Sequence, residues 1–375
     1  MKFIVSSTEL LSHLTTISKV VSSKSTLPIL DHFLFDLNDS ELKITASDLE
    51  STLITRLSPE NTDGQGLIAI EAKRLMDILR EFPEQPLTFE IDQESLEVNI
   101  LSENGKFTVY GMYGEEFPQL PELNEEKRTS ISVPAKLLAS GVNKTIFAVA
   151  NDDLRPVMNG IFFQIEKDNI TFVSSDSHKL VRYTRYDAKS ENESSFILPK
   201  KPAAFIKGII NNNMEDVTIE FDEKNAVFNF GKTKLVCRLT EGQFPKYQSV
   251  IPTSNPHKIV VDRLTLLNSI KRVSVFSSQA SNLIKLNMKD DQITVSAQDI
   301  DFSISAYERI NCQYESEELT IGFKSLFIID ILANMSCKEV VLELATSQIA
   351  GLILPFDKAS EMEDELMLLM PMSID

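Results

Sequence analysis

The chain is poor in cysteine and has no long hydrophobic run. Its 375 residues include only Cys237, Cys312 and Cys337, an odd number at wide spacing that supports neither a disulfide framework nor a paired-cysteine metal site. No apolar run approaches the ~18 residues that cross a bilayer. Residues 1–6 also lack the basic segment and hydrophobic stretch of a secretion signal. These absences predict a cytoplasmic protein with no membrane partner.

Positive charge is also scarce. Lys and Arg number 37 against 55 Asp and Glu, which gives a net charge of −18 at pH 7. A uniformly basic nucleic-acid binder is therefore excluded, and any contact with DNA requires basic residues to gather on one face. The apolar fraction of 42% and the charged fraction of 25% are ordinary for a globular protein, and they exclude a disordered or collagen-like chain.

Recognisable catalytic motifs are missing as well. The sequence has no Gly-rich phosphate loop, no G-x-S-x-G elbow and no H-E-x-x-H. Its four histidines, His13, His32, His178 and His257, lack the spacing of metal ligands, so we interpret them as structural or exposed residues. We therefore expect no catalytic residue, no bound metal and no cofactor.

An internal repeat organises the chain. Three alternating, β-branched runs end at Asp48, Asp176 and Asp299, at intervals of 128 and 123 residues. An Ile-x-x-Lys motif, a leucine pair and a Phe-Pro pair recur at nearly the same interval. The repeat predicts three similar domains with boundaries at 1–128, 129–253 and 254–375. Because equivalent positions in different domains should lie far apart, we interpret the aspartates as turn caps and not as acid–base groups.

Each domain divides into two similar halves, and each half combines one helix with several strands. Helices are predicted over 8–20, 72–81, 135–148, 200–211, 262–275 and 324–334, and strands over segments such as 33–37, 217–221 and 340–344. Two helices among many strands indicate an α+β fold with antiparallel sheets, not a parallel doubly wound sheet. The polar segments 122–129 and 252–257 are predicted linkers. Residues 366–372 are predicted to form a final strand, which Pro371 places at a sheet edge.

All six predicted helices are expected to carry basic residues on the side away from their apolar stripes. Examples are Lys73, Arg74, Arg80, Lys136, Lys144, Lys200, Lys201, Lys207, Arg263, Lys271 and Arg272. On one helix such residues would merely solvate an exposed face. Their recurrence in three domains favours a shared basic surface.

In whole motifs the chain resembles the bacterial sliding clamps, the beta subunits of DNA polymerase III. The resemblance rests on residues 1–3, 26–30, 47–50, 159–160, 175–180, 242–245 and 369–372, in that family's order and spacing. It implies the DNA clamp fold, in which three similar α+β domains each have an internal pseudo-twofold repeat. It also implies a head-to-tail homodimeric ring that encircles duplex DNA without base readout and confers processivity on the polymerase.

Simple geometry favours two copies in such a ring. A domain of about 125 residues has a diameter of roughly 35 Å. Three such spheres leave a hole of about 5 Å, whereas six leave about 35 Å, enough for a duplex roughly 20 Å across. A closed ring then needs only weak attraction to phosphates.

The resemblance also implies sites. DNA-facing positions are Lys24, Lys73, Arg74, Arg155, Lys200 and Lys201. The partner-peptide cleft matches Met158, Ser175, Ser177, His178, Lys179, Leu180, Pro245, Ser249, Val250, Leu368, Leu369, Met370, Pro371 and Met372. The dimer contact matches Phe107, Val109, Val275 and Phe276. Expected partners are the polymerase alpha subunit, the clamp loader, other polymerases and repair proteins, bound through short linear motifs. The chain departs from the family pattern at Asp152, Pro156, Val157 and the tail 373–375.

Two alternatives stay open at this point. A repeat-built scaffold for proteins would share the threefold period but would not need basic helices. An enzyme that uses the repeated aspartates would need a nucleophile or metal cluster, which the sequence does not offer.

Overall fold

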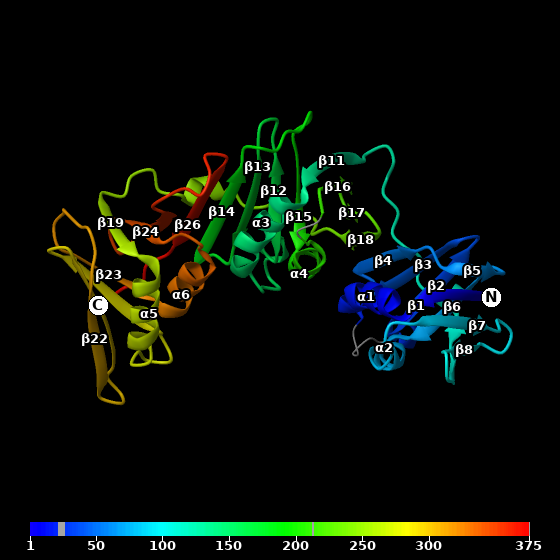
Figure 1. Ribbon diagram of the computed structural model, residues 1–375. Helices are drawn as coiled ribbons and strands as arrows, with labels where there is room; N and C mark the ends of the chain where they lie inside the picture. Colours follow the sequence, from blue (N-terminus) through cyan, green and yellow to red (C-terminus); the bar gives the residue numbers. More distant parts are fainter. Residues whose placement is uncertain (22–26, 212–213, 375) are drawn as a thin grey trace. The chain divides into compact units, whose positions relative to one another are not determined.

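The computed structural model describes residues 1–21, 27–211 and 214–374. These residues contain six α-helices and four sheets in which the strand pairs are antiparallel. The chain forms two compact units, Met1–Ala139 with Ala204–Leu239, and Ser140–Ala203 with Thr240–Asp375. Figure 1 shows both units and labels the helices and many of the strands.

The first unit contains two sheets. The five-stranded sheet has the order β5 (Glu60–Asp63), β1 (Lys2–Ser6), β7 (Pro86–Ile91), β8 (Glu97–Leu101) and β9 (Lys106–Tyr110). The nine-stranded sheet has the order β10 (Met112–Tyr113), β6 (Gly66–Glu71), β2 (His32–Asn38), β3 (Glu41–Ser47), β4 (Ser51–Leu57), β18 (Thr233–Arg238), β17 (Asn225–Phe230), β16 (Asp216–Phe221) and β11 (Thr129–Pro134). Since β4 pairs with β18, the first two sequence repeats share one sheet.

The second unit also contains two sheets. The eight-stranded sheet has the order β15 (Ser194–Pro199), β12 (Gly160–Ile165), β13 (Ile170–Ser175), β14 (Lys179–Arg185), β26 (Glu363–Leu369), β25 (Gly351–Pro355), β24 (Glu339–Leu344) and β19 (His257–Asp262). The four-stranded sheet has the order β22 (Ile304–Asn311), β21 (Gln292–Asp299), β20 (Leu283–Lys289) and β23 (Leu319–Lys324). The β14–β26 pair joins the second repeat to the third in the same way.

Each helix buries one apolar stripe, and side chains cap the starts of α1 and α5. The six are α1 (Ser7–Ile17), α2 (Ala72–Arg80), α3 (Ala135–Thr145), α4 (Lys200–Ile209), α5 (Arg263–Ser274) and α6 (Ser325–Asn334). The Ser6 hydroxyl accepts the Glu9 N–H at 3.1 Å at the start of α1. Leu10, Leu14 and Ile17 are fully buried on one face of that helix.

The predicted α+β fold is confirmed, and each predicted helix exists within a few residues of its expected bounds. Two short 3-10 turns, Ser18–Val20 and Ile146–Ala148, account for the excess predicted after α1 and α3. The predicted linkers 122–129 and 252–257 contain only the first residues of β11 and β19.

Two predictions about the elements are wrong. The last strand, β26, is central in its sheet, not at an edge, because Pro371 follows its final residue Leu369 and leaves the hydrogen-bonding ladder intact. Helices α1 and α6 contain no Lys or Arg. Lys19 falls in the turn after α1, and Lys324 precedes α6 as its N-cap residue. The basic residues are therefore concentrated on four helices.

Membrane-spanning helices and metal-binding clusters are both absent from the described residues. None of the helices there is long and apolar enough to cross a membrane. Over the same part of the chain, no group of three or more His, Cys, Asp or Glu side chains is arranged to hold a metal ion.

Candidate functional site

The recurrent aspartates cap tight turns, as predicted. Asp48 Oδ1 accepts the N–H groups of Glu50 at 3.0 Å and Ser51 at 2.6 Å. Asp176 Oδ1 accepts two N–H groups at 3.0 and 2.8 Å, and Asp299 Oδ1 accepts two at 3.1 and 3.3 Å. The N–H groups that the Asp176 turn holds belong to His178 and Lys179, two residues of the predicted peptide cleft.

The predicted peptide-binding residues meet where β14 and β26 pair. Lys179 lies opposite Leu369 and Leu180 opposite Leu368 in the register of the two strands. The Met370 N–H extends this pairing by donating to the His178 carbonyl at 2.8 Å. Residues 178–180 and 368–370, far apart in the sequence, therefore form one surface, which we call the docking surface.

A buried lysine and an aromatic ring form one side of the docking surface. The Lys179 side chain is only 6% exposed, and its Nζ pairs with Asp176 at 2.9 Å and with Asp330 at 3.3 Å. The same Nζ lies 4.7 Å from the centre of the Phe327 ring, and the His178 ring stacks on Phe327 at 5.3 Å. Phe327 and Asp330, both on α6, were missed by the sequence reasoning.

The loop 151–158 forms another side. Asp152 accepts from Arg155 Nε at 2.8 Å and from the Leu154 N–H at 2.9 Å. The hydrogen bond from Arg155 holds the pKa of Asp152 below its usual range. Arg155 Nη1 also donates to the Ser177 hydroxyl, which in turn donates to Met158 Sδ at 3.7 Å. Arg155 is therefore engaged at the docking surface.

A third segment packs beside these strands. Phe244 and Tyr247 are buried in one apolar cluster with Leu180 and Leu368. They anchor the segment that carries Pro245, Ser249 and Val250, all of which are exposed. Val250 is 55% exposed and Met370 is 39% exposed, so apolar side chains reach solvent there. Ser175, by contrast, is buried and donates to the Lys179 carbonyl at 2.9 Å. It supports the surface without being accessible.

The tail continues from this surface onto the four-stranded sheet. The Met372 N–H donates to the Gly322 carbonyl at 2.8 Å, and Lys285 Nζ donates to the Ile374 carbonyl at 3.2 Å. Pro371 and Met372 are half-buried along this path.

The predicted DNA-facing residues lie on two helices and one loop. Lys73 and Arg74 are exposed on α2, where Arg74 pairs with Glu71 at 3.0 Å, and Lys200 and Lys201 are exposed in the first turn of α4. Two other basic residues of the predicted shared surface point inward. Lys144 pairs with Glu365, and Arg263 donates to the carbonyls of Cys337 and Leu332, both at 2.8 Å. Lys24 lies outside the described residues.

The predicted dimer residues lie on one end strand and just after one helix. Phe107 and Val109 are on β9, an end strand of the five-stranded sheet. Val275 and Phe276 follow α5 and are 74% and 38% exposed. Four further exposed apolar residues were missed, namely Tyr110 on β9, Tyr307 on β22, and Ile300 and Phe302 in the turn before β22. No repeated motif marks them. For Tyr307, the alternation along β22 was an available signal.

Three similar α+β domains joined by shared antiparallel sheets define the DNA clamp class of proteins. Family models of the DNA polymerase III beta subunit match the chain over residues 1–121 for the N-terminal domain, 132–246 for the central domain and 248–372 for the C-terminal domain. The chain belongs to the DNA polymerase III beta subunit family. It is a DNA sliding clamp, a processivity factor and not an enzyme.

Individual relatives agree with this assignment. The beta sliding clamp of Haemophilus influenzae is 28% identical over 344 residues, covering 91% of this chain and 92% of that protein. A DNA polymerase III beta subunit structure from Thermotoga maritima is 26% identical, with a TM-score of 0.89 and full coverage of both chains. The subunit from Pseudomonas aeruginosa has the same fold, with a TM-score of 0.93 at 23% identity and full coverage of both chains.

Proposed function

We propose that two copies of this chain join head to tail into a ring that encloses duplex DNA in the cytoplasm and tethers the replicative polymerase to it. Within each copy we propose domains at 1–128, 129–253 and 254–375. The observation that carries the proposal is a pair of end strands, β9 in the first repeat and β22 in the third, each with a neighbour on one side only among the described residues.

Both end strands carry exposed apolar side chains. Phe107 and Tyr110 on β9 are 37% and 67% exposed, and Ile304 and Tyr307 on β22 are 40% and 68% exposed. An uncovered apolar edge strand is a template for pairing with another chain. Because the two edges differ, pairing between them is heterologous, and closure after two copies gives a ring.

A pocket beside β9 supports the same contact between two copies, which we call the ring joint. It has a volume of about 280 Å³ and lies between α2 and β9, where Leu75, Ile78 and Val109 line it. The partner's Val275 and Phe276 are apolar and exposed, so burying them in this pocket would stabilise the ring.

Sedimentation of charged variants tests the joint. Phe107→Asp and Phe276→Asp should each give monomers, because a carboxylate buried in an apolar contact is strongly destabilising. Phe356→Asp is the matched control, since Phe356 is 47% exposed but lies after β25. It should remain a dimer. If both joint variants sediment like the control, the joint lies elsewhere.

Retention on DNA tests the ring. With a clamp loader and ATP, the protein should stay on circular DNA and run off linear DNA, because a closed ring is held by topology and not by adhesion. A scaffold attracted only by charge would treat both forms alike. The logarithm of the DNA-binding constant falls linearly with the logarithm of the salt concentration. Lys200→Ala and Lys201→Ala should each reduce the magnitude of this salt slope by about 1. Lys224→Ala, an exposed lysine of the β16–β17 turn, should leave that slope unchanged.

We further propose that the docking surface binds short linear motifs of the polymerase alpha subunit, the clamp loader, other polymerases and repair proteins. Its apolar residues fit a peptide that inserts hydrophobic side chains, and the flexible Met370 suits several partners. A fluorescent C-terminal peptide of the cognate alpha subunit should bind about 10-fold more weakly to Met370→Ala. Met362→Ala, at the opposite end of β26, is the control and should bind normally. Equal affinities would exclude this surface.

A further inference from the structure

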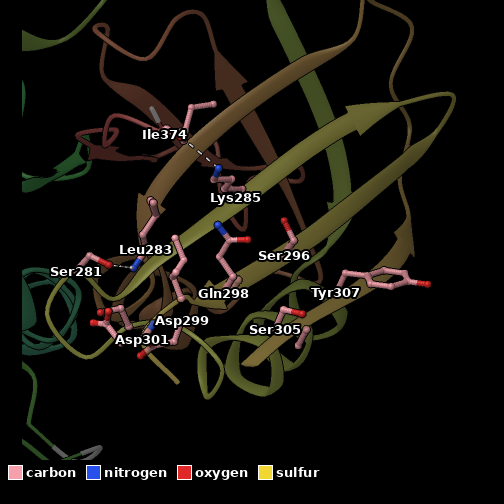
Figure 2. A pocket seen from close by; sticks show the side chains of 14 residues that line it. Ser281, Leu283, Lys285, Ser296, Gln298, Asp299, Asp301, Ser305, Tyr307 and Ile374 are labelled. Carbon is pink, nitrogen blue, oxygen red and sulfur yellow. Dashed lines mark hydrogen bonds between the residues drawn. The ribbon is translucent and has the colours of Figure 1, made fainter. Parts of the chain in front are cut away.

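A polar pocket lies on the four-stranded sheet of the second unit. Its volume is about 580 Å³, and Figure 2 shows Lys285, Gln298 and Ser305 standing on neighbouring strands around it. The alternate residues Leu286, Val295 and Ala297 are buried on the helix side of this sheet. The pocket therefore opens on the outer face, away from α5 and α6.

The chain's own tail closes one wall of this pocket. Ile374 lines it and is held by the hydrogen bond from Lys285 Nζ at 3.2 Å. Ser305 and Tyr307 form another part of its lining, and they lie on β22, which pairs with β21 and with no other strand of the described chain. The pocket thus adjoins the strand edge at which the proposed ring joint would add a partner strand.

The alternation of β9 decides which of its residues would reach this pocket. Phe107 lies opposite Ile100, and Val109 lies opposite Val98. Both partners are fully buried on the helix side of their sheet. Successive strand residues face opposite sides, so Tyr110 points to the outer face.

The alternation of β22 gives the matching faces. Ala306 lies opposite the buried Ala297, and Glu308 pairs with Arg272 of α5 at 2.5 Å, so both point to the helix side. Ser305 and Tyr307 therefore point to the outer face. An antiparallel joint that places Phe107 on the apolar helix side must place Tyr110 on the outer side, because a one-residue slip would reverse both.

We propose that Tyr110 of a second copy inserts into this outer pocket and completes it. The inference rests on the proposed head-to-tail ring. Tyr110 is 67% exposed in the single chain, and an aromatic ring with a hydroxyl at its tip suits a cavity lined by both apolar and polar groups. Gln298 and Ser305 supply hydrogen-bonding groups, and the Tyr307 ring supplies an aromatic neighbour. Antiparallel registers with the correct faces set Tyr110 opposite Ser303, Ser305 or Tyr307.

Cysteine cross-linking of the full chain tests the placement. Tyr110→Cys is combined in turn with Ser303→Cys, Ser305→Cys and Tyr307→Cys, and the purified dimers are oxidised. One of the three pairs should form an interchain disulfide, because the bond requires Cβ atoms about 4 Å apart. The three native thiols offer little competition. Cys237 is buried, and burial raises the pKa of Cys312 to about 11 and that of Cys337 above its usual value.

Controls separate this inference from the ring itself. Tyr110→Cys is also combined with Ala306→Cys and with Lys289→Cys. Ala306 points to the helix side of the sheet, and Lys289 lies at the far end of β20, so neither pair should cross-link. A disulfide to Ala306, or dimers that cross-link at none of the three outer positions, would overturn the pocket while leaving the ring standing. A protein that sediments as a monomer would overturn the proposed ring.

A second measurement uses substitution without new cysteines. Tyr110→Ala should weaken dimer formation about 10-fold in sedimentation equilibrium. Tyr113→Ala is the control, because Tyr113 is 50% exposed but lies on β10 of the other sheet. It should leave the dimerisation constant unchanged. Equal effects of the two substitutions would contradict the inference.

Discussion

A buried ion pair at the junction of the second and third repeats provides a sharp test of the energetics. Lys144, near the end of α3, pairs with Glu365 of β26, and their side chains are 17% and 7% exposed. Lys144 Nζ also lies 5.2 Å from the centre of the Tyr183 ring. Glu365 Oε1 has no hydrogen-bond partner within the described residues. Burial raises the pKa of Glu365, and Lys144 opposes that shift.

Removing the cation should therefore be far more damaging than removing a surface lysine. In Lys144→Met the carboxylate keeps its burial and loses its counterion, which should reduce the free energy of unfolding by about 3–5 kcal/mol at pH 8. Lys358→Met is the control. Lys358 pairs at 3.3 Å with Asp364, which lies on β26 next to Glu365, but the Lys358 side chain is 60% exposed. Its loss should therefore cost about 0–1 kcal/mol.

The raised pKa of Glu365 determines how the effect of Lys144→Met should change with pH. A carboxyl group whose folded pKa is raised above 4.5 penalises the folded state when it is ionised, and this penalty disappears as the pH falls toward 4.5. Lys144→Met should therefore lose less stability at pH 5 than at pH 8. The double variant Lys144→Met with Glu365→Met should recover most of the loss. Urea unfolding followed by circular dichroism measures all four proteins. A Lys144→Met protein as stable as Lys358→Met at pH 8 would refute the reasoning.

Three further predictions follow from packing, burial and capping. Gly141→Ala should destabilise the protein by about 1–3 kcal/mol in urea unfolding, because a Cβ there would lie 2.4 Å from the Phe172 ring, whereas Gly105→Ala meets nothing closer than 3.4 Å and should be neutral. Burial lowers the pKa of His13 below 6.5, so His13 binds a proton more readily in the unfolded chain than in the folded protein. The free energy of unfolding is therefore unaffected by His13 well above pH 6.5 and falls as the pH drops below that value. A pH titration of unfolding should show that loss reduced in His13→Gln, and an unchanged profile would contradict it. Asp176→Ala removes a carboxylate that accepts two backbone N–H groups, and Asp222→Ala removes one that accepts three. Each substitution should cost at least about 1 kcal/mol, yet only Asp176→Ala should weaken peptide binding in the fluorescence assay.

Local sequence patterns predicted many elements of the fold. Leu75, Met76 and Leu79 recur at helical spacing, and all three are buried on α2 where a helix was predicted. The threefold repeat likewise predicted that Asp48 and its equivalents lie at the ends of strands and cap turns. The hydrogen bonds that Asp48 accepts from the next turn confirm this role. These features depend on residues a few positions apart, and a single sequence records such relations directly.

Strand neighbours and the composition of the docking surface could not be read in the same way. Pro371 suggested an edge, although β26 lies between β14 and β25. The stacking of His178 on Phe327 joins residues from different repeats, and nothing in the spacing of either indicates the other.

The amino-acid order by itself therefore determined the period, the helices, the turn caps and the family resemblance, because these arise from short-range periodicity and local hydrogen bonding. Only the tertiary structure decided that β9 and β22 are end strands and that the tail closes a pocket beside one of them. Which strand lacks a neighbour depends on pairing between distant segments, since every backbone edge looks alike until its partners are placed.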